Sequence, residues 1–301
     1  MELLRLLESL RSPGLDTLFG LITRFGEETI LVALVCLLFW CVDKRMAYVV
    51  GVAFFLSSLL VQGMKIVFRV PRPWVADPSF SPVQGAIREA TGYAFPSGHT
   101  QNAAAVLGSL GAMTRRALQV SLFTIAILVG FSRLYLGVHY LPDVLASLGI
   151  SFLLVFLALK LVTCEPVSKK REFLLALLIA LGAVVVLVIA ARSYHGALSA
   201  PSHLRDSTRN AGAALGFAVG MYVERIYVRF SVRAKSLPFQ IVKFALGIGG
   251  LLILREGVRE LSTGLVTEAL GYFLVVLWII LLFPLLIKRF FAPREEAAVG
   301  E

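Results

Sequence analysis

Long apolar blocks, separated by short charged clusters, run through most of this 301-residue chain. A stretch of about 18 or more such residues is long enough to cross a bilayer as a helix, which satisfies its own backbone polar groups in lipid. Composition agrees, because 58% of the residues are hydrophobic and 16% are charged. In an average soluble domain about 45–50% of the residues are hydrophobic and about 25% are charged. The pattern predicts an all-α, polytopic transmembrane helix bundle.

Nine spans are predicted from the apolar blocks and the charges at their ends. Prolines at 71, 73 and 78 make residues 69–95 a loop. No repeat or linker divides the chain, so one domain over residues 1–301 is predicted, with a core at about 28–192 and extra helices at about 209–287. The spans lie at about Glu28–Val42, Met46–Phe68, Pro96–Met113, Ala117–Leu136, Val144–Thr163, Glu172–Arg192, Arg209–Val228, Phe239–Leu254 and Gly264–Ile287.

The first 25 residues are amphipathic rather than uniformly apolar. Leucines at 3, 4, 7 and 10 recur at helical spacing among Glu and Arg, and Ser12-Pro13-Gly14 then interrupts the pattern. We expect an interfacial helix, or a pair of them, in the membrane plane, the alternative being a frayed cytosolic start. The interspersed charges leave no clean apolar core for a cleavable signal peptide.

The net charge of +10 comes from basic residues at the ends of apolar blocks. That placement suits membrane topology and lipid headgroups, and we expect no nucleic-acid partner. Cys36, Cys41 and Cys164 lack metal-ligand spacing and are predicted to be packing residues. Glycines at 212, 216 and 220 predict a close helix–helix seam, within the chain or in a dimer, so the oligomeric state stays open.

Three polar clusters interrupt the apolar sequence between Lys65 and Asp143. They read Lys65-Ile-Val-Phe-Arg-Val-Pro-Arg72-Pro73, then Pro96-Ser97-Gly98-His99, then Ser132-Arg133-Leu-Tyr-Leu-Gly-Val-His139-Tyr-Leu-Pro-Asp143. Ionisable groups inside a membrane are costly, which favours a functional site over stray charge. Alternating spans put all three clusters on one face, and lysine-rich clusters such as Lys169-Lys170-Arg171 on the other. The positive-inside rule therefore predicts an inner- or plasma-membrane protein with a non-cytoplasmic site.

The residue types in these clusters suit phosphoryl chemistry. Ser97 is predicted to cap a helix whose N-terminus binds an anion, with Gly98 leaving the backbone accessible and His99 facing the same anion. His139 and Asp143 are four apart; on a helix they would share a face, where the carboxylate orients the imidazole. The cations at Lys65, Arg72 and Arg133 suit a transferring phosphoryl group without a metal. Arg69 and Arg88 are predicted to be interfacial residues that contact lipid phosphate.

Together, Lys65-x6-Arg72-Pro73, Pro96-Ser97-Gly98-His99 and Ser132-Arg133-x5-His139-x3-Asp143 resemble the signature of the type 2 phosphatidic acid phosphatase family, which shares its site with vanadium haloperoxidases. The resemblance covers about residues 60–150. It implies a phosphatase that works through a covalent phosphohistidine, with no metal or cofactor. His139 would be the nucleophile, Asp143 its orienting partner and His99 the general acid. Lys65, Arg72, Ser97, Gly98 and Arg133 would bind the phosphoryl oxygens.

The substrate expected from this resemblance is a lipid phosphate, such as a polyprenyl diphosphate, phosphatidate or phosphatidylglycerophosphate. A layout of about nine spans with an outward N-terminus is similar instead to that of the glucose-6-phosphatase and sphingosine-phosphate phosphatase branches. A soluble phosphate ester is therefore an alternative substrate. A non-enzymatic anion transporter or channel is a third, against which the paired His139 and Asp143 argue. His195 and His203, in a predicted polar loop, are more often solvated bystanders than headgroup ligands.

Overall fold

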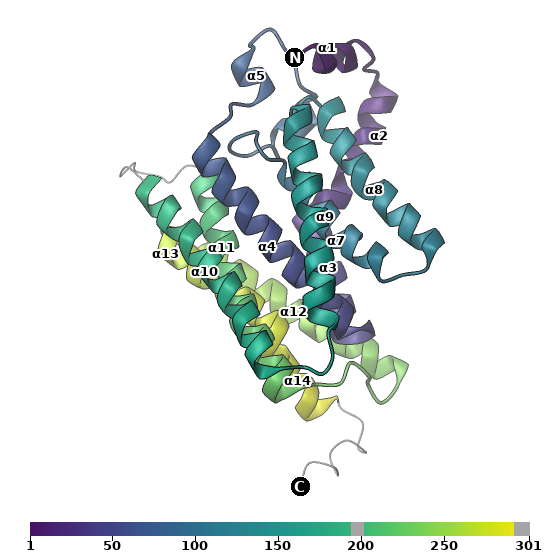
Figure 1. Ribbon diagram of the computed structural model, residues 1–301, viewed down its shortest axis with the longest axis vertical. Helices are drawn as coiled ribbons and strands as arrows, with labels where there is room; N and C mark the ends of the chain where they lie inside the picture. Colours follow the sequence, from purple (N-terminus) through teal and green to yellow (C-terminus); the bar gives the residue numbers. More distant parts are fainter. Residues whose placement is uncertain (194–201, 292–301) are drawn as a thin grey trace.

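In the computed structural model the chain folds into a helical bundle (Figure 1). The structure describes residues 1–193 and 202–291, within which there is no β-strand, so the all-α prediction is confirmed. The long helices are α4 (Lys44–Phe68), α7 (Gly98–Ala112), α8 (Arg116–Tyr135), α9 (Leu141–Thr163), α10 (Lys169–Ser193), α11 (Ser202–Val223), α12 (Leu237–Leu261) and α13 (Leu265–Leu277), the last continued by η4 (Trp278–Leu282) and α14 (Phe283–Phe290).

Helices α4 and α7 form the centre of the bundle. Helix α4 contacts α7, α9, α10 and α11, and α7 contacts α8 and α9. Residues 47–53 of α4 and 103–111 of α7 are all buried. Helix α4 starts where the Asp43 carboxylate accepts the N–H groups of Arg45 and Met46, at 2.8 and 3.1 Å, as an N-cap. Packing on all sides fixes the ends of α4 and α7, which carry the first two polar clusters.

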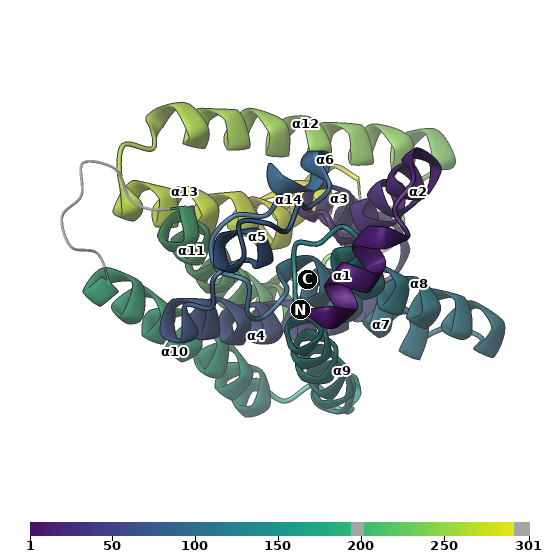
Figure 2. The same cartoon turned by 90° about the horizontal axis from the view of Figure 1, so that it is seen from above.

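The C-terminal helices pack on this core through the predicted glycine seam. A Cβ atom at Gly212 or Gly216 of α11 would overlap the carbonyl oxygens of Ala269 and Phe273 in the α13 segment. The seam is therefore confirmed as a contact within the chain. Seen from above, α12 lies at one edge of the bundle and α9 and α10 at the opposite edge (Figure 2).

The N-terminal residues form two helices that differ in placement. Helix α1 (Glu2–Ser9) is amphipathic and lies across the end of the bundle that carries α5 (Figure 1), as expected for an interfacial helix. Helix α2 (Pro13–Thr23) runs beside α8 instead. A turn at Arg24–Gly26 joins it to α3 (Glu28–Leu37) and η2 (Leu38–Val42), with a 47° bend between the halves. The second part of the expected interfacial segment thus lies along the bundle, because its apolar face packs against α8.

Six helices in the described residues are long and apolar enough to cross a membrane, or seven if the bent α2–α3 pair counts as one span. The predicted third and seventh spans exist as α7 and α11 but do not meet that standard. Helix α7 has 15 residues, and α11 begins with polar turns that include Arg205, Asp206 and Arg209. Neighbouring helices enclose both, so neither needs a lipid-facing apolar surface. The number nine stays a prediction.

Two smaller expectations are revised. The predicted loop at 69–95 contains two short helical turns, α5 (Pro73–Ala76) and α6 (Gln84–Ile87). Cys36 is buried in the main core and Cys41 packs against it, as predicted, but Cys164 is exposed after the end of α9. Cys164 is therefore not a packing residue.

Candidate active site

The three polar clusters meet at one end of the bundle. The first lies at the C-terminal end of α4, the second at the start of α7, and the third between α8 and α9. Backbone contacts join them, since Ser97 N–H donates to the Asp143 carbonyl at 3.2 Å. A Cβ at Gly98 would lie 3.6 Å from Lys65 Nζ. The fold thus brings all eight predicted site residues to one region.

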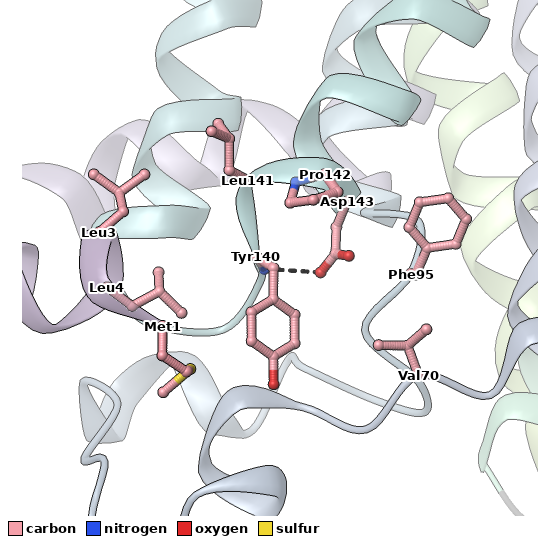
Figure 3. Close-up of a pocket in the computed structure, with 9 residues that line it drawn as sticks. All are labelled: Met1, Leu3, Leu4, Val70, Phe95, Tyr140, Leu141, Pro142 and Asp143. Atoms are coloured by element: carbon pink, nitrogen blue, oxygen red, sulfur yellow. Dashed lines mark hydrogen bonds between the residues drawn. The ribbon is translucent and has the colours of Figure 1, made fainter.

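His139 and Asp143 form a buried pair, each 2% exposed. His139 Nδ1 lies 3.3 Å from Asp143 Oδ2. The expectation that they share a helix face is wrong, because His139 precedes α9. Pro142 is accommodated in the first turn of a helix, and α9 accordingly begins at Leu141. Asp143 reaches back from that turn, and its Oδ2 also accepts the Tyr140 N–H at 2.8 Å (Figure 3).

Arg72 contacts the other nitrogen of His139. Its Nη1 lies 2.9 Å from Nε2, and a guanidinium can only donate, so Nε2 is the acceptor and Nδ1 carries the proton. The other partners of Arg72 are the carbonyl oxygens of Val138 at 2.8 Å, Gly92 at 3.0 Å and Thr91 at 2.6 Å. None of these partners is negatively charged. His139 lies in the loop outside the spanning helices, and burial, followed by Arg72, lowers its pKa well below the ordinary value. Both effects favour the neutral imidazole.

Arg133 supplies a second buried guanidinium, from the last turn of α8. It is 0% exposed, and its Nη1 donates to the Thr23 hydroxyl at 2.7 Å. Its Nε and Nη2 are buried without a hydrogen-bond partner among residues 1–193 and 202–291. Leaving charged donors unsatisfied is costly, and a bound anion would remove that cost.

Ser97 and Lys65 flank the start of α7. Ser97 occupies the N-cap position as predicted, but in the described structure its side chain makes no capping bond. Its hydroxyl instead accepts a hydrogen bond from Thr100 at 2.9 Å, which leaves the Ser97 O–H proton free for another acceptor. Lys65 is 9% exposed on the last turn of α4. The helix N-terminus, this hydroxyl and the ammonium are groups of the kinds that bind anions.

His99 lies at the edge of the cluster. Its Nε2 is 3.4 Å from Oε2 of Glu89, a loop carboxylate whose pKa the His99 imidazole lowers. Sequence reasoning missed Glu89, as it missed Thr23, because neither lies in a cluster and both reach the site only through tertiary contacts. Arg69 ends α4 in the left-handed region at φ 50°, with Nε donating to the Ile66 carbonyl at 3.0 Å. In the described residues the Arg69 side chain forms no hydrogen bond with any of the eight predicted site residues.

The two further histidines differ. His203 belongs to α11, not to a loop, and its ring lies 4.8 Å from that of Tyr93. His195 lies outside the described residues. Within residues 1–193 and 202–291, no group of three or more His, Cys, Asp or Glu side chains is placed to bind a metal ion.

An apolar pocket of about 390 Å³ opens beside the dyad of His139 and Asp143. Figure 3 shows Leu3 and Leu4 of α1 on one side, Val70 and Phe95 on the other, and Asp143 between them. Sequence reasoning did not predict that α1 would line the site. The pocket places an apolar surface next to Asp143 and the cationic groups around it.

Comparison with known proteins agrees with this arrangement. Residues 45–166 match the family model of the PAP2 superfamily. Residues 208–295 match the model described as PAP2 superfamily phosphatase, transmembrane extension. The first region contains nearly all of α4 and the helices up to α9, and the second contains most of α11 and the helices from α12 to α14.

Three curated relatives are similar. Phosphatidylglycerophosphatase B of Bacillus subtilis is 30% identical over 49% of this chain and 75% of its own length. Undecaprenyl-diphosphatase BcrC of the same species is 32% identical over 48% and 72%. Human sphingosine-1-phosphate phosphatase 2 is 25% identical over 81% and 65%. The chain belongs to the PAP2 superfamily, as a membrane phosphatase of its lipid-phosphatase family that carries the transmembrane extension.

Proposed function

We propose that this protein hydrolyses a lipid phosphomonoester or diphosphate through a phosphohistidine at His139, without a metal. The observation that carries the proposal is the line from Arg72 through His139 to Asp143. It leaves His139 neutral, protonated on Nδ1 and with the Nε2 lone pair on the side of the cations. An oriented imidazole of this kind is prepared to act as a nucleophile.

In the first step, Nε2 of His139 attacks phosphorus. The P–N bond forms as the bond from phosphorus to the leaving oxygen breaks, and His99 gives that oxygen its proton. Asp143 holds the Nδ1 proton and stabilises the positive charge that develops on the ring. In the second step water attacks phosphorus, its proton passes to His99, and the P–N bond breaks. Inorganic phosphate leaves, and both histidines return to their starting states.

The phosphoryl oxygens would be held by Lys65, Arg72 and Arg133 together with Ser97 and the backbone N–H of Gly98. Positively charged donors that are already in place stabilise the charge of the transferring group without reorganising. The neutral partners of Arg72 and the unpartnered Nε and Nη2 of Arg133 support this role. The cations supply the charge compensation that a metal provides in other phosphoryl-transfer enzymes.

The apolar pocket beside Asp143 favours a lipid substrate over a soluble ester. A lipid phosphate has an apolar tail joined to its reacting group, and the pocket lies directly beside the proposed dyad. The relatives are phosphatases whose names specify phosphatidylglycerophosphate, undecaprenyl diphosphate and sphingosine 1-phosphate. Phosphatidylglycerophosphate, phosphatidate and polyprenyl diphosphates are therefore the substrates to test first.

We place the site on the non-cytoplasmic side of an inner or plasma membrane. The positive-inside rule supports this side, because basic clusters such as Lys169-Lys170-Arg171, which begins α10, lie at the end opposite the site (Figure 1). A single cysteine introduced beside the site in a cysteine-free variant and labelled from one side tests this. Labelling only from the cytoplasm would contradict the assignment.

Phosphate release from purified protein in detergent tests the reaction. Lipid phosphates and soluble esters are offered with a chelator present, to the parent and to His139→Asn. We expect chelator-resistant turnover of lipid phosphates that the variant lacks, and inhibition by vanadate. Retained activity in His139→Asn, or loss of parental activity to the chelator, would overturn the mechanism. Preference for soluble esters would assign the protein to that alternative.

A further inference from the structure

The start of α11 contacts the loop that contains Arg72. Asp206, on the second turn of α11, accepts a hydrogen bond from the Thr91 hydroxyl at 2.8 Å. The carbonyl of the same Thr91 accepts from Arg72 Nη2 at 2.6 Å, and the next carbonyl, that of Gly92, accepts from Arg72 Nε at 3.0 Å. One residue of the loop thus bonds to α11 through its side chain and to the site arginine through its backbone.

His203, one turn earlier on α11, packs on the same loop. Its ring lies 4.8 Å from the Tyr93 ring, and a Cβ added at Gly92 would come within 2.8 Å of His203 Cβ. Gly92 has φ +60°, a conformation that glycine adopts without strain. The backbone at 91–92 is therefore placed from one side by α11 and from the other by Arg72.

Helix α11 itself is fixed against the core. Ser207 and Asn210 of α11 bond to Gln62 at 3.3 Å and Ser58 at 2.5 Å, both on α4, the helix that carries Lys65 on its last turn. On the other side, Arg205 bonds to Glu268 of α13, whose carboxylate is buried. Helix α11 is thus held by both α4 and α13, and provides a rigid support for the loop.

We infer that Thr91, Asp206 and His203 are positioning residues, through which α11, the helix that leads into the transmembrane extension, sets the orientation of the Arg72 guanidinium for phosphoryl binding. The inference rests on the proposed function and assigns a role to the start of α11 in it. When the Thr91 and Gly92 carbonyls are fixed, the Arg72 guanidinium has fewer orientations to lose on binding an oxyanion. The contacts from α11 therefore act on anion affinity.

The test compares Thr91→Val, which removes the hydroxyl at nearly constant shape, with Thr91→Ser, which keeps it. We expect Thr91→Val to raise KM and the vanadate inhibition constant in parallel by about three- to tenfold, the effect of one hydrogen bond. Thr91→Ser should stay within about twofold of the parent. Thr163→Val is the matched control, since it removes one hydroxyl hydrogen bond, to the Leu159 carbonyl at the C-terminal end of α9, away from this loop.

Double variants decide whether the effect passes along the proposed contacts. Thr91→Val combined with Asp206→Ala should raise the vanadate inhibition constant no more than whichever single change has the larger effect. In an Arg72→Lys background, Thr91→Val should leave vanadate affinity unchanged. A vanadate constant equal to the parent's in Thr91→Val, or effects that multiply in either double variant, would overturn the inference. A His139→Asn protein that keeps activity would instead overturn the proposed function, so the two failures are distinguishable.

Discussion

Arg72 Nη1 lies 2.9 Å from Nε2 of His139, so the atom proposed to attack phosphorus is the one that the site arginine contacts. An incoming phosphoryl oxygen would take over this donor as phosphorus approaches the lone pair. In the proposed mechanism the guanidinium keeps Nε2 unprotonated before the substrate binds and stabilises negative charge afterwards. Phosphate binding and preparation of the nucleophile would then depend on the same side chain.

The dyad geometry predicts a large effect of Asp143→Asn. The carboxylate accepts both His139 Nδ1–H and the Tyr140 N–H, so an amide in its place loses the charge and favours the wrong histidine tautomer. The corresponding change in serine-protease triads lowers kcat by about 10⁴-fold, and we expect a loss of at least about 100-fold here. Steady-state kinetics on a lipid phosphate measure it, with the exposed Glu256→Gln on α12 as the control. A kcat within threefold of the parent would contradict the orienting role.

His139 predicts a pH dependence. Burial and Arg72 lower its pKa below the ordinary value of about 6.5. The folded protein therefore keeps this ring neutral as the pH falls through 6.5, and protonates it only below the lowered pKa. Nitrogen-15 NMR of histidine-labelled protein in detergent measures this directly, with His139→Asn to assign the signal among four histidines. A His139 signal that titrates at or above about pH 6.5 would contradict the neutral nucleophile.

The motif residues were predictable because they are close together in sequence and carry costly charges. Sequence spacing also gave the helix order and the Gly212 seam. The remaining features depend on contacts between distant segments. Thr23 reaches Arg133 across 110 positions, and Asp206 reaches Thr91 across 115, with no local pattern to mark either contact. The four-residue spacing of His139 and Asp143 identified the correct pair for an incorrect reason, since α9 starts between them.

The apolar pocket predicts a change in tail selectivity when α1 is altered. Leu3 lines the pocket, whereas Leu6 on the same helix is exposed and does not line it. Leu3→Trp should raise KM for long-tailed lipid phosphates by about threefold or more, since added ring atoms displace tail methylenes worth about 0.8 kcal/mol each. Turnover of a short-chain ester should change less. Leu6→Trp is the matched control. If Leu3→Trp and Leu6→Trp change the KM of long-tailed and short-chain substrates equally, the pocket does not bind the tail.

The seam between α11 and α13 predicts opposite stability effects for two glycine-to-alanine changes. At Gly212 a methyl group would overlap the Ala269 backbone, which cannot rotate away, and overpacking of this kind costs about 1–3 kcal/mol. At Gly249 on α12 no atom of residues 1–193 and 202–291 lies within 4 Å of the new methyl, so the higher helix propensity of alanine should stabilise by about 0.5–1 kcal/mol. Thermal unfolding in detergent compares them: Gly212→Ala should lower Tm and Gly249→Ala should maintain or raise it.

Since α11 also supports the Thr91 loop, Gly212→Ala should weaken vanadate inhibition as well, whereas Gly249→Ala should not. An unchanged Tm in Gly212→Ala would mean that the two helices pack less closely than the structure indicates.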